Sequence, residues 1–193
     1  DHSLSPKLHN HWLKENKIDA IYDKKKIDEN DLKTVFSEFK EKKINGINVT
    51  VPYKKSVIPY LDKLSSEAKQ TQSVNTIFLM NDNLVGHNTD INGFKKAIQN
   101  LNFNIKDKKI FILGAGGVVP SIIFSLIRMN VSEIIISNRT RQKADDLKSR
   151  FKNLNVIDWG SIPNFDVIIN ATSLGLKNEV MNLNFSQVGE KKL

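Results

Sequence analysis

The stretch from Ile110 to Gly117, which reads IFILGAGG, decides the expected fold. Its apolar residues are typical of a short buried strand, and the glycines that follow predict a tight turn. Residues 118–127 then place apolar side chains at helical spacing, with Pro120 in the first turn, where its missing N–H costs little. A strand, a glycine turn and a helix in this order bring backbone N–H groups and a helix N-terminus to a pyrophosphate.

The glycine turn matches the usual dinucleotide pattern imperfectly, because Val119 stands at its sixth position. A tight turn that binds nothing is therefore the alternative. The next predicted strand ends in Asn138-Arg139-Thr140, about twenty residues on, where an NAD site carries an acidic residue. An arginine there suits the 2′-phosphate of NADP, since guanidinium forms charge-assisted bonds with phosphate oxygens. Otherwise Arg139 is a loop residue in solvent and Thr140 caps the next helix.

Working outward, short apolar runs alternate with amphipathic helices, which predicts an α/β fold with a parallel sheet. After the glycine turn we expect strands over 134–137, 156–158 and 165–170 and a helix over 142–151. Before it we expect helices over 5–15, 30–43, 54–60, 65–72 and 89–101, and strands over 18–23, 47–51, 74–80 and 84–86. The polar segment 102–109 divides the chain into expected domains 1–103 and 104–193.

The composition is that of an ordinary globular protein, with 39% hydrophobic and 26% charged residues among 193. No apolar run approaches the roughly 20 residues of a membrane helix. The absence of cysteine excludes disulfides, thiol nucleophiles and cysteine metal sites, and it suits a reducing cytoplasm. The 29 basic residues exceed the 21 acidic ones, a net charge of +8, but they are scattered along the chain. We expect a cytoplasmic protein without a nucleic-acid, membrane or metal partner.

Polar residues in the first half form small clusters, each with a structural alternative. Ser3 and Ser5 face one way in an extended chain, although Ser5 is also a candidate helix N-cap. Thr50 shares a strand face with Asn48. Lys54 is expected in the first turn of a helix, where the helix dipole disfavours an ammonium, so a purely structural lysine is poorly placed there. A lysine in solvent is the alternative.

Two further clusters lie before the predicted boundary. Asn75 and Thr76 follow the start of a predicted strand and could simply close a turn. Asp90 falls in the first turn of a helix, where the dipole favours a carboxylate. We assign no role to His87, for which a loop histidine in solvent and a catalytic histidine are the alternatives.

Together these clusters resemble the motifs of the shikimate dehydrogenase family. The resemblance runs from residue 1 to about 176 through seven collinear motifs: HSLSP..HN at 2–10, NVTxPxK at 48–54, SVNT at 73–76 (which resembles the family's GAxNT), GxNTD at 86–90, GAGG at 114–117, NRT at 138–140 and NATxxG at 170–175. The chain begins inside the first motif and stops before the family's VYxP and GxxMLxxQ segments. The resemblance therefore implies truncation at both ends, without the opening strand and the C-terminal part, and a weak or inactive catalyst.

The resemblance implies an α/β substrate-binding catalytic domain followed by a Rossmann-type domain that binds NADP(H). It also implies reversible NADPH-dependent reduction of 3-dehydroshikimate to shikimate, on the way to chorismate and aromatic amino acids. Lys54 and Asp90 would be the catalytic pair, with the proton left unassigned to either. Substrate would be bound by Ser3, Ser5, Thr50, Asn75 and Asp90. Cofactor would be bound by Gly114, Ala115, Gly116, Gly117, Asn138, Arg139, Thr140, Thr172 and Ser173.

Three alternatives stay open. The most similar alternative is a quinate/shikimate dehydrogenase with relaxed substrate or NAD use. The residues Ser3, Ser5 and Arg139 argue against it. A glutamyl-tRNA reductase could share the glycine turn, but not the motifs before residue 91, and it would require a nucleophilic cysteine. A nucleotide-binding regulatory module without catalysis is the third. The protein is expected to be a monomer or a homodimer.

Overall fold

A computed structural model describes residues 3–175, 181 and 183–186, so His2 of the first motif lies outside the described part. The chain forms two compact units, residues 1–43 and 44–193. The fold is mixed α/β and contains a parallel sheet, which confirms the expected class.

The first unit contains two helices, α1 (Ser5–Glu15) and α2 (Leu32–Lys40). Helix α2 buries its predicted apolar face: Leu32, Val35, Phe36 and Phe39. Ser5 is the first residue of α1 and not its N-cap, which is Leu4. The Ser5 N–H instead donates to Ser3 Oγ at 3.3 Å, so Ser3 provides the acceptor that a helix start requires.

The predicted strand over 18–23 is wrong, because this segment has no strand neighbour in the described structure. A β-strand forms only where a neighbouring strand makes hydrogen bonds with its backbone N–H and C=O groups. Here the Asn10 side chain takes that place. Asn10 Oδ1 accepts from the Tyr22 N–H at 2.8 Å, and Asn10 Nδ2 donates to the Tyr22 carbonyl at 2.7 Å.

The second unit begins with a mixed sheet of order β1-β3-β4-β2. Its members are β1 (Gly46–Asn48), β2 (Lys63–Leu64), β3 (Thr76–Met80) and β4 (Asn83–His87), with the 3-10 helix η1 (Ile58–Tyr60) and helix α3 (Ser66–Thr71) between β1 and β3. Strands β3 and β4 are joined by Asn81 and Asp82, both at positive φ, as a tight hairpin turn requires.

The predicted helix over 54–60 is largely wrong. Residues 51–57 form consecutive turns, and only Ile58–Tyr60 is helical. Pro52 cannot donate a backbone hydrogen bond, and the bonds that follow alternate between three-residue and four-residue closures: the Tyr53 N–H donates to the Thr50 carbonyl, and the Val57 N–H to the Tyr53 carbonyl. Lys54 therefore lies in a turn and not at a helix start.

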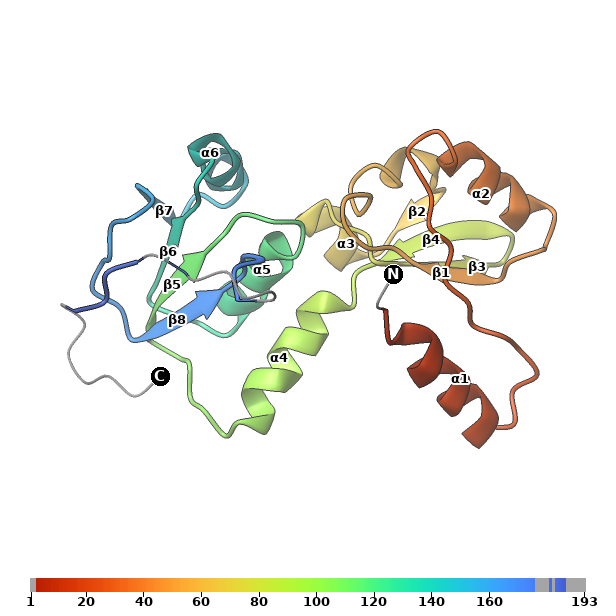
Figure 1. The fold of residues 1–193 in the computed structure, drawn as a ribbon, viewed down its shortest axis with the longest axis horizontal. Helices are drawn as coiled ribbons and strands as arrows, with labels where there is room; N and C mark the ends of the chain where they lie inside the picture. The colour runs from red at the N-terminus through yellow and green to blue at the C-terminus, as the bar shows by residue number, and fades with distance from the viewer. Residues whose placement is uncertain (1–2, 176–180, 182, 187–193) are drawn as a thin grey trace. The chain divides into compact units, whose positions relative to one another are not determined.

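Helix α4 (Asp90–Asn100) leads from the mixed sheet to a parallel sheet of order β7-β6-β5-β8. Its elements are β5 (Lys109–Leu113), α5 (Val119–Arg128), β6 (Glu133–Ser137), α6 (Arg141–Arg150), β7 (Leu154–Ile157) and β8 (Val167–Asn170), close to the predicted spans. The chain moves outward from β5 to β7 and then returns to the other side of β5 as β8 (Figure 1).

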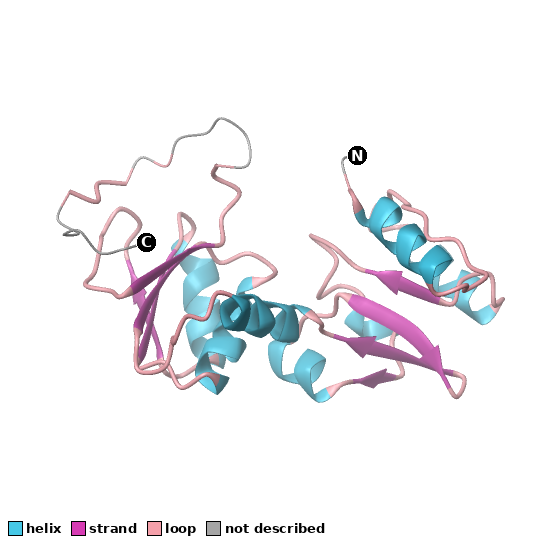
Figure 2. Cartoon of the chain, turned by 90° about the horizontal axis from the view of Figure 1, so that it is seen from below, coloured by secondary structure: helices cyan, strands magenta, loops and turns pink. Residues whose placement is uncertain are grey.

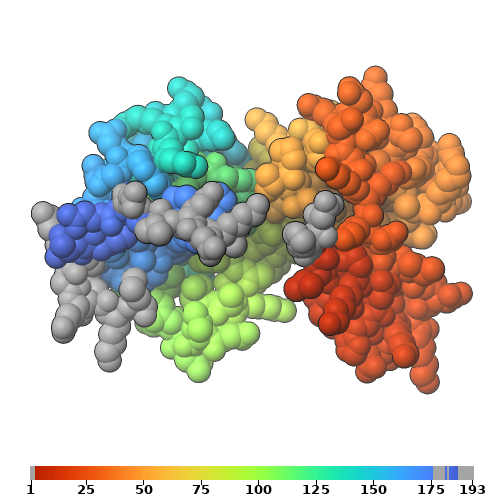
Figure 3. All heavy atoms as spheres, viewed as in Figure 1, coloured from red at the N-terminus to blue at the C-terminus, as the bar shows by residue number. Residues whose placement is uncertain are grey.

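The main core lies on the helix-covered face of the parallel sheet. Ile110 and Ile112 of β5 pack there with Ile123 and Leu126 of α5. Figure 2 shows the helices beside the strands of this sheet. Helix α4 adds Phe94 and Ile98 to the same cluster, so that α4 and α5 lie side by side (Figure 1). In the space-filling view, α4 lies on the face turned toward the reader (Figure 3).

Candidate active site

One edge of the mixed sheet gathers the predicted polar residues of the second unit. Asn48 at the end of β1 pairs with Thr76 at the start of β3, and Thr76 pairs with His87 at the end of β4. The segments beyond these three residues therefore leave the sheet at one edge. They carry Thr50 and Lys54, then Asn75, then Asp90.

Lys54 and Asp90 form an ion pair, with Lys54 Nζ 2.7 Å from Asp90 Oδ2. Their side chains keep only 14% and 22% of their possible exposure, so the pair is largely shielded from solvent. Asp90 is the first residue of α4, where the helix dipole stabilises a carboxylate. The ammonium donates one of its three N–H groups to Asp90, which leaves others for a second acceptor.

Asn75 fixes the other carboxylate oxygen. Asn75 Nδ2 donates to Asp90 Oδ1 at 2.9 Å, and Asn75 Oδ1 accepts from the Thr89 N–H at 2.9 Å. Both oxygens of Asp90 are thus held, one by a cation and one by an amide, so the carboxyl plane has a defined orientation. Thr50 lies exposed four residues before Lys54.

Ser3 and Ser5 belong to the first unit, where other side chains order the start of α1. His9 Nδ1 lies 2.9 Å from the Ser5 carbonyl, and the His9 ring stacks on Tyr22 with centroids 4.2 Å apart. Burial raises the pKa of the Tyr22 phenol, while its hydrogen bond with the Ser5 side chain acts in the opposite direction. The phenol therefore stays protonated at neutral pH.

The glycine turn has the geometry of a phosphate cradle. Gly114 has φ of 104°, and a Cβ there would lie 2.8 Å from the Ala171 carbonyl oxygen. At Gly116 a Cβ would meet no clash, since its nearest neighbour, the Ala171 carbonyl oxygen, would lie 3.9 Å away, an ordinary van der Waals distance. In the described part of the chain, nothing accepts a hydrogen bond from the N–H of Gly116 or Gly117. These residues fit a dinucleotide pyrophosphate, which needs close approach and free backbone donors.

Two further loops lie at the same edge of the parallel sheet, because Leu113 pairs with Ser137 of β6 and with Asn170 of β8. In the first of these loops, Asn138 Oδ1 accepts from the Ala115 N–H at 3.1 Å and so fastens the glycine turn. Asn138 Nδ2 donates to the Thr140 carbonyl at 2.8 Å. Thr140 occupies the N-cap position of α6, although its side chain makes no capping bond.

Arg139 is exposed, and among the described residues no carboxylate lies within ion-pair distance of it. Its neighbour Arg141, in contrast, pairs with Asp145 at 3.6 Å and with Asp158. Arg139 can therefore bind a phosphate without first breaking an ion pair, whereas Arg141 cannot.

The third loop closes on itself. Thr172 Oγ1 donates to Asn170 Oδ1 at 2.7 Å and accepts from the Leu174 N–H at 3.1 Å. Ser173 lies exposed at the tip. The carbonyl of Ala171 is the group that excludes a side chain at Gly114, so this loop lies directly against the glycine turn.

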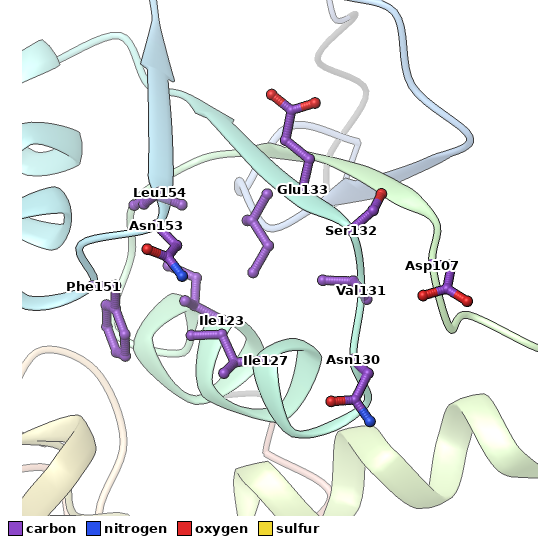
Figure 4. Close-up of a pocket in the computed structure, with 11 residues that line it drawn as sticks. Asp107, Ile123, Ile127, Asn130, Val131, Ser132, Glu133, Phe151, Asn153 and Leu154 are labelled. Atoms are coloured by element: carbon purple, nitrogen blue, oxygen red, sulfur yellow. The ribbon is translucent and has the colours of Figure 1, made fainter.

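A hollow of about 380 Å³ lies at the opposite end of the parallel sheet (Figure 4). It is lined by Asp107, Ile123, Ile127, Asn130, Val131, Ser132, Glu133, Ile134, Phe151, Asn153 and Leu154. Ligands of open parallel sheets bind at the carboxyl ends of the strands, and residues 130–134 lead into the amino end of β6. Within the described residues, no cluster of three or more His, Cys, Asp or Glu side chains could hold a metal ion, and no helix is long and apolar enough to span a membrane.

Asn88, which received no role in the sequence-based predictions, is fully buried, and its side chain bonds to the Ser73 carbonyl and to Ser121 of α5. The available signal was its position two residues before a helical aspartate, where an asparagine side chain commonly accepts a backbone bond. His87 is not a free loop residue, because it ends β4 and its Nδ1 lies 2.8 Å from Ser65 Oγ.

The fold and these loops define a class: an α/β protein with a Rossmann-type nucleotide edge and a lysine–aspartate pair at a second sheet edge. Comparison with known families is more specific. The family described as "Shikimate dehydrogenase substrate binding domain" matches residues 1–77, and the family described as "Shikimate / quinate 5-dehydrogenase" matches residues 95–184.

Individual relatives agree. The chain is 48% identical over 192 residues to the shikimate dehydrogenase (NADP(+)) of Pelagibacter ubique, covering 99% of this chain and 72% of that protein. The crystal structure of the Aquifex aeolicus shikimate dehydrogenase matches with a TM-score of 0.88 and 37% identity, over 96% of this chain and 70% of the other. The Listeria monocytogenes enzyme, solved with shikimate and NAD, matches with a TM-score of 0.83 and 30% identity, over 91% of this chain and 66% of the other.

The chain belongs to the shikimate dehydrogenase family. This confirms the predicted resemblance and the predicted arrangement of a substrate-binding part before a nucleotide-binding part. The chain spans 63% to 67% of the length of four further curated relatives, all named shikimate dehydrogenase (NADP(+)).

Proposed function

We propose that this protein catalyses the reversible NADPH-dependent reduction of 3-dehydroshikimate to shikimate. The single observation that carries the proposal is the shielded Lys54–Asp90 pair, 2.7 Å apart, in one compact unit with a glycine turn whose Gly116 and Gly117 N–H groups have no acceptor among the described residues. Reduction of a ketone to an alcohol needs a hydride donor and a proton donor, and these two sites provide for both.

NADPH, when bound, supplies the hydride that adds to the carbonyl carbon of the substrate. The backbone N–H groups of Gly116 and Gly117 would hold its pyrophosphate, and Arg139 its 2′-phosphate. Thr172 and Ser173 would line the nicotinamide side. Gly114, Ala115, Asn138 and Thr140 would shape these loops, since the N–H of Ala115 is already taken up by Asn138.

The Lys54–Asp90 pair would deliver the proton to the carbonyl oxygen as it becomes an alkoxide, and would accept it in the oxidation direction. The two groups act as one unit, and we assign the proton to the pair. Thr50 and Asn75 would bind the ring oxygens beside the pair, and Ser3 and Ser5 would donate to the substrate carboxylate. We also infer a cytoplasmic enzyme, monomeric or dimeric, with its functional division between residues 103 and 104.

The test is the shikimate-dependent reduction of NADP+, monitored by the absorbance of NADPH. The same assay with quinate in place of shikimate, and with NAD+ in place of NADP+, gives the comparison. We expect shikimate with NADP+ to give the highest kcat/KM. A second candidate is quinate, which the description of the second family names. Higher kcat/KM with quinate would make the protein a quinate dehydrogenase, and no turnover of either substrate would overturn the proposal.

A further inference from the structure

Nearly all buried polar side chains of the described residues gather where the mixed sheet meets helix α5. They are Thr71, Ser73, Asn88, Ser121 and Ser125, each at most 3% exposed; the one elsewhere is Ser137 in β6. Polar groups are retained in such a place only when they are hydrogen-bonded, and every buried side-chain nitrogen and oxygen in the described residues has a partner. This cluster is therefore a built network.

Asn88 is the centre of the network. Its Nδ2 donates to the Ser73 carbonyl at 2.8 Å and to Ser121 Oγ at 2.9 Å, and it lies 3.3 Å from Thr71 Oγ1. Its Oδ1 accepts from the Asp90 N–H at 3.0 Å. One fully buried amide thus uses both its donors and its acceptor. Because the surroundings exclude water, no solvent molecule replaces a bond that is broken there.

One side of Asn88 leads to the catalytic pair. Asp90 begins α4, and its N–H is one of those that a helix start leaves without an internal partner. Asn88 supplies that partner, and so fixes the backbone from which the Asp90 carboxylate reaches Lys54.

The other side of Asn88 leads to the glycine turn. Ser121 lies in the first turn of α5, four residues after Gly117. A second bond joins the network to the turn itself, since Ser73 Oγ donates to the Gly117 carbonyl at 3.3 Å. A phosphate held by the N–H groups of Gly116 and Gly117 would therefore act on a loop that is bonded to this network.

We propose that Asn88 is a positioning residue that couples nucleotide occupancy of the glycine turn to the orientation of Asp90. The inference rests on the proposed function for the identity of the nucleotide, NADPH, but not for the identity of the substrate. Two sites are coupled when both of them shift the equilibrium of one shared structural element. Asn88 is bonded both to the segment that carries Asp90 and to the segment that carries the glycine turn. Such coupling is reciprocal: substrate at the Lys54–Asp90 pair would also strengthen NADPH binding.

The chain offers a matched pair of variants on one helix. Ser121→Ala removes the bond from α5 to Asn88. Ser125→Ala makes the same chemical change in the same helix at an equally buried site, but it removes a bond to the Ile91 carbonyl (3.3 Å), which does not involve Asn88. A general loss of packing would affect both variants alike.

The measurement is amide hydrogen exchange of the segment 88–92 with and without saturating NADPH. We expect NADPH to slow exchange about threefold or more in the unmodified protein and in Ser125→Ala, and to leave it nearly unchanged in Ser121→Ala. In turnover, Ser121→Ala should lower kcat about fivefold while the Kd for NADPH stays within about twofold, because the phosphate donors are untouched.

Equal NADPH-dependent protection in the two serine variants would overturn the inference, as would the absence of protection in the unmodified protein. The proposed function fails separately. If NADPH protects the segment in the expected pattern but shikimate is not oxidised, the substrate assignment is wrong and the coupling stands. If NADPH does not bind at all, both are overturned.

Discussion

The two sheet edges of the second unit build their sites in opposite ways. At the edge of the mixed sheet, side chains hold one another: Lys54 and Asn75 fix the two oxygens of Asp90 before any ligand binds. At the edge of the parallel sheet, the glycine turn offers the backbone N–H groups of Gly116 and Gly117, which have no acceptor among the described residues. The first site depends on contacts between side chains, and the second depends on glycines, which have no side chain to obstruct the phosphate. Removing atoms should damage the first edge, and adding atoms should damage the second.

The largest effect is expected from Lys54→Ala, which removes the cation of the pair. It should lower kcat by roughly 10²–10⁴, as loss of a positioned acid or base does, and leave the Kd for NADPH unchanged. Lys55→Ala is the matched control, since Lys55 is exposed and makes no ion pair in the described structure. Steady-state kinetics of shikimate oxidation provide the comparison. Equal losses in the two variants would contradict the assignment of Lys54.

Arg139→Ala tests the side chain at the nucleotide edge that we expect to contact the 2′-phosphate of the cofactor. A charge-assisted hydrogen bond is worth about 1.5–3 kcal/mol, so the preference for NADP+ over NAD+ should fall roughly tenfold to a hundredfold. Activity with NAD+ should change little. The readout is the ratio of the two kcat/KM values. An unchanged ratio would mean that a residue other than Arg139 contacts the 2′-phosphate.

The sequence predicted the nucleotide edge better than the edge that holds the pair. Local signals specify the former: apolar runs for β5 and β6, glycines for the turn, and an arginine at the end of the second strand. The strand expected over 18–23 and the helix start expected at Lys54 were wrong, because long-range pairing and consecutive turns decide those segments. The bonds that the Asn88 amide donates join residues 15 to 33 positions apart, and no local pattern predicts them.

Gly116→Ala tests the opposite rule, that added atoms damage the nucleotide edge. The new methyl would clash with no protein atom, since its nearest neighbour, the Ala171 carbonyl oxygen, would lie 3.9 Å away, an ordinary van der Waals distance. The free energy of unfolding should therefore stay within about 0.5 kcal/mol. The Kd for NADPH should rise about tenfold, because the methyl occupies the space that the phosphate needs. Urea unfolding and NADPH titration separate the two effects. An unchanged Kd would mean that the phosphate does not approach this glycine.

Asn138→Ala should give the smallest effect and the sharpest contrast with its neighbour Arg139. Asn138 Oδ1 holds the Ala115 N–H at 3.1 Å and its Nδ2 holds the Thr140 carbonyl at 2.8 Å, so its amide is committed to the shape of two loops. A lost hydrogen bond of this kind is worth about 0.5–1.5 kcal/mol, which corresponds to roughly threefold to tenfold weaker binding. These two hydrogen bonds hold the backbone that would bind the pyrophosphate, which both nucleotides share. The binding of NADPH and the binding of NADH should therefore weaken equally. Titration of both nucleotides against this variant and Arg139→Ala gives the comparison. If Asn138→Ala weakened NADPH alone, the side chain would be a ligand of the 2′-phosphate, and the nucleotide edge would depend on side chains as much as the other edge does.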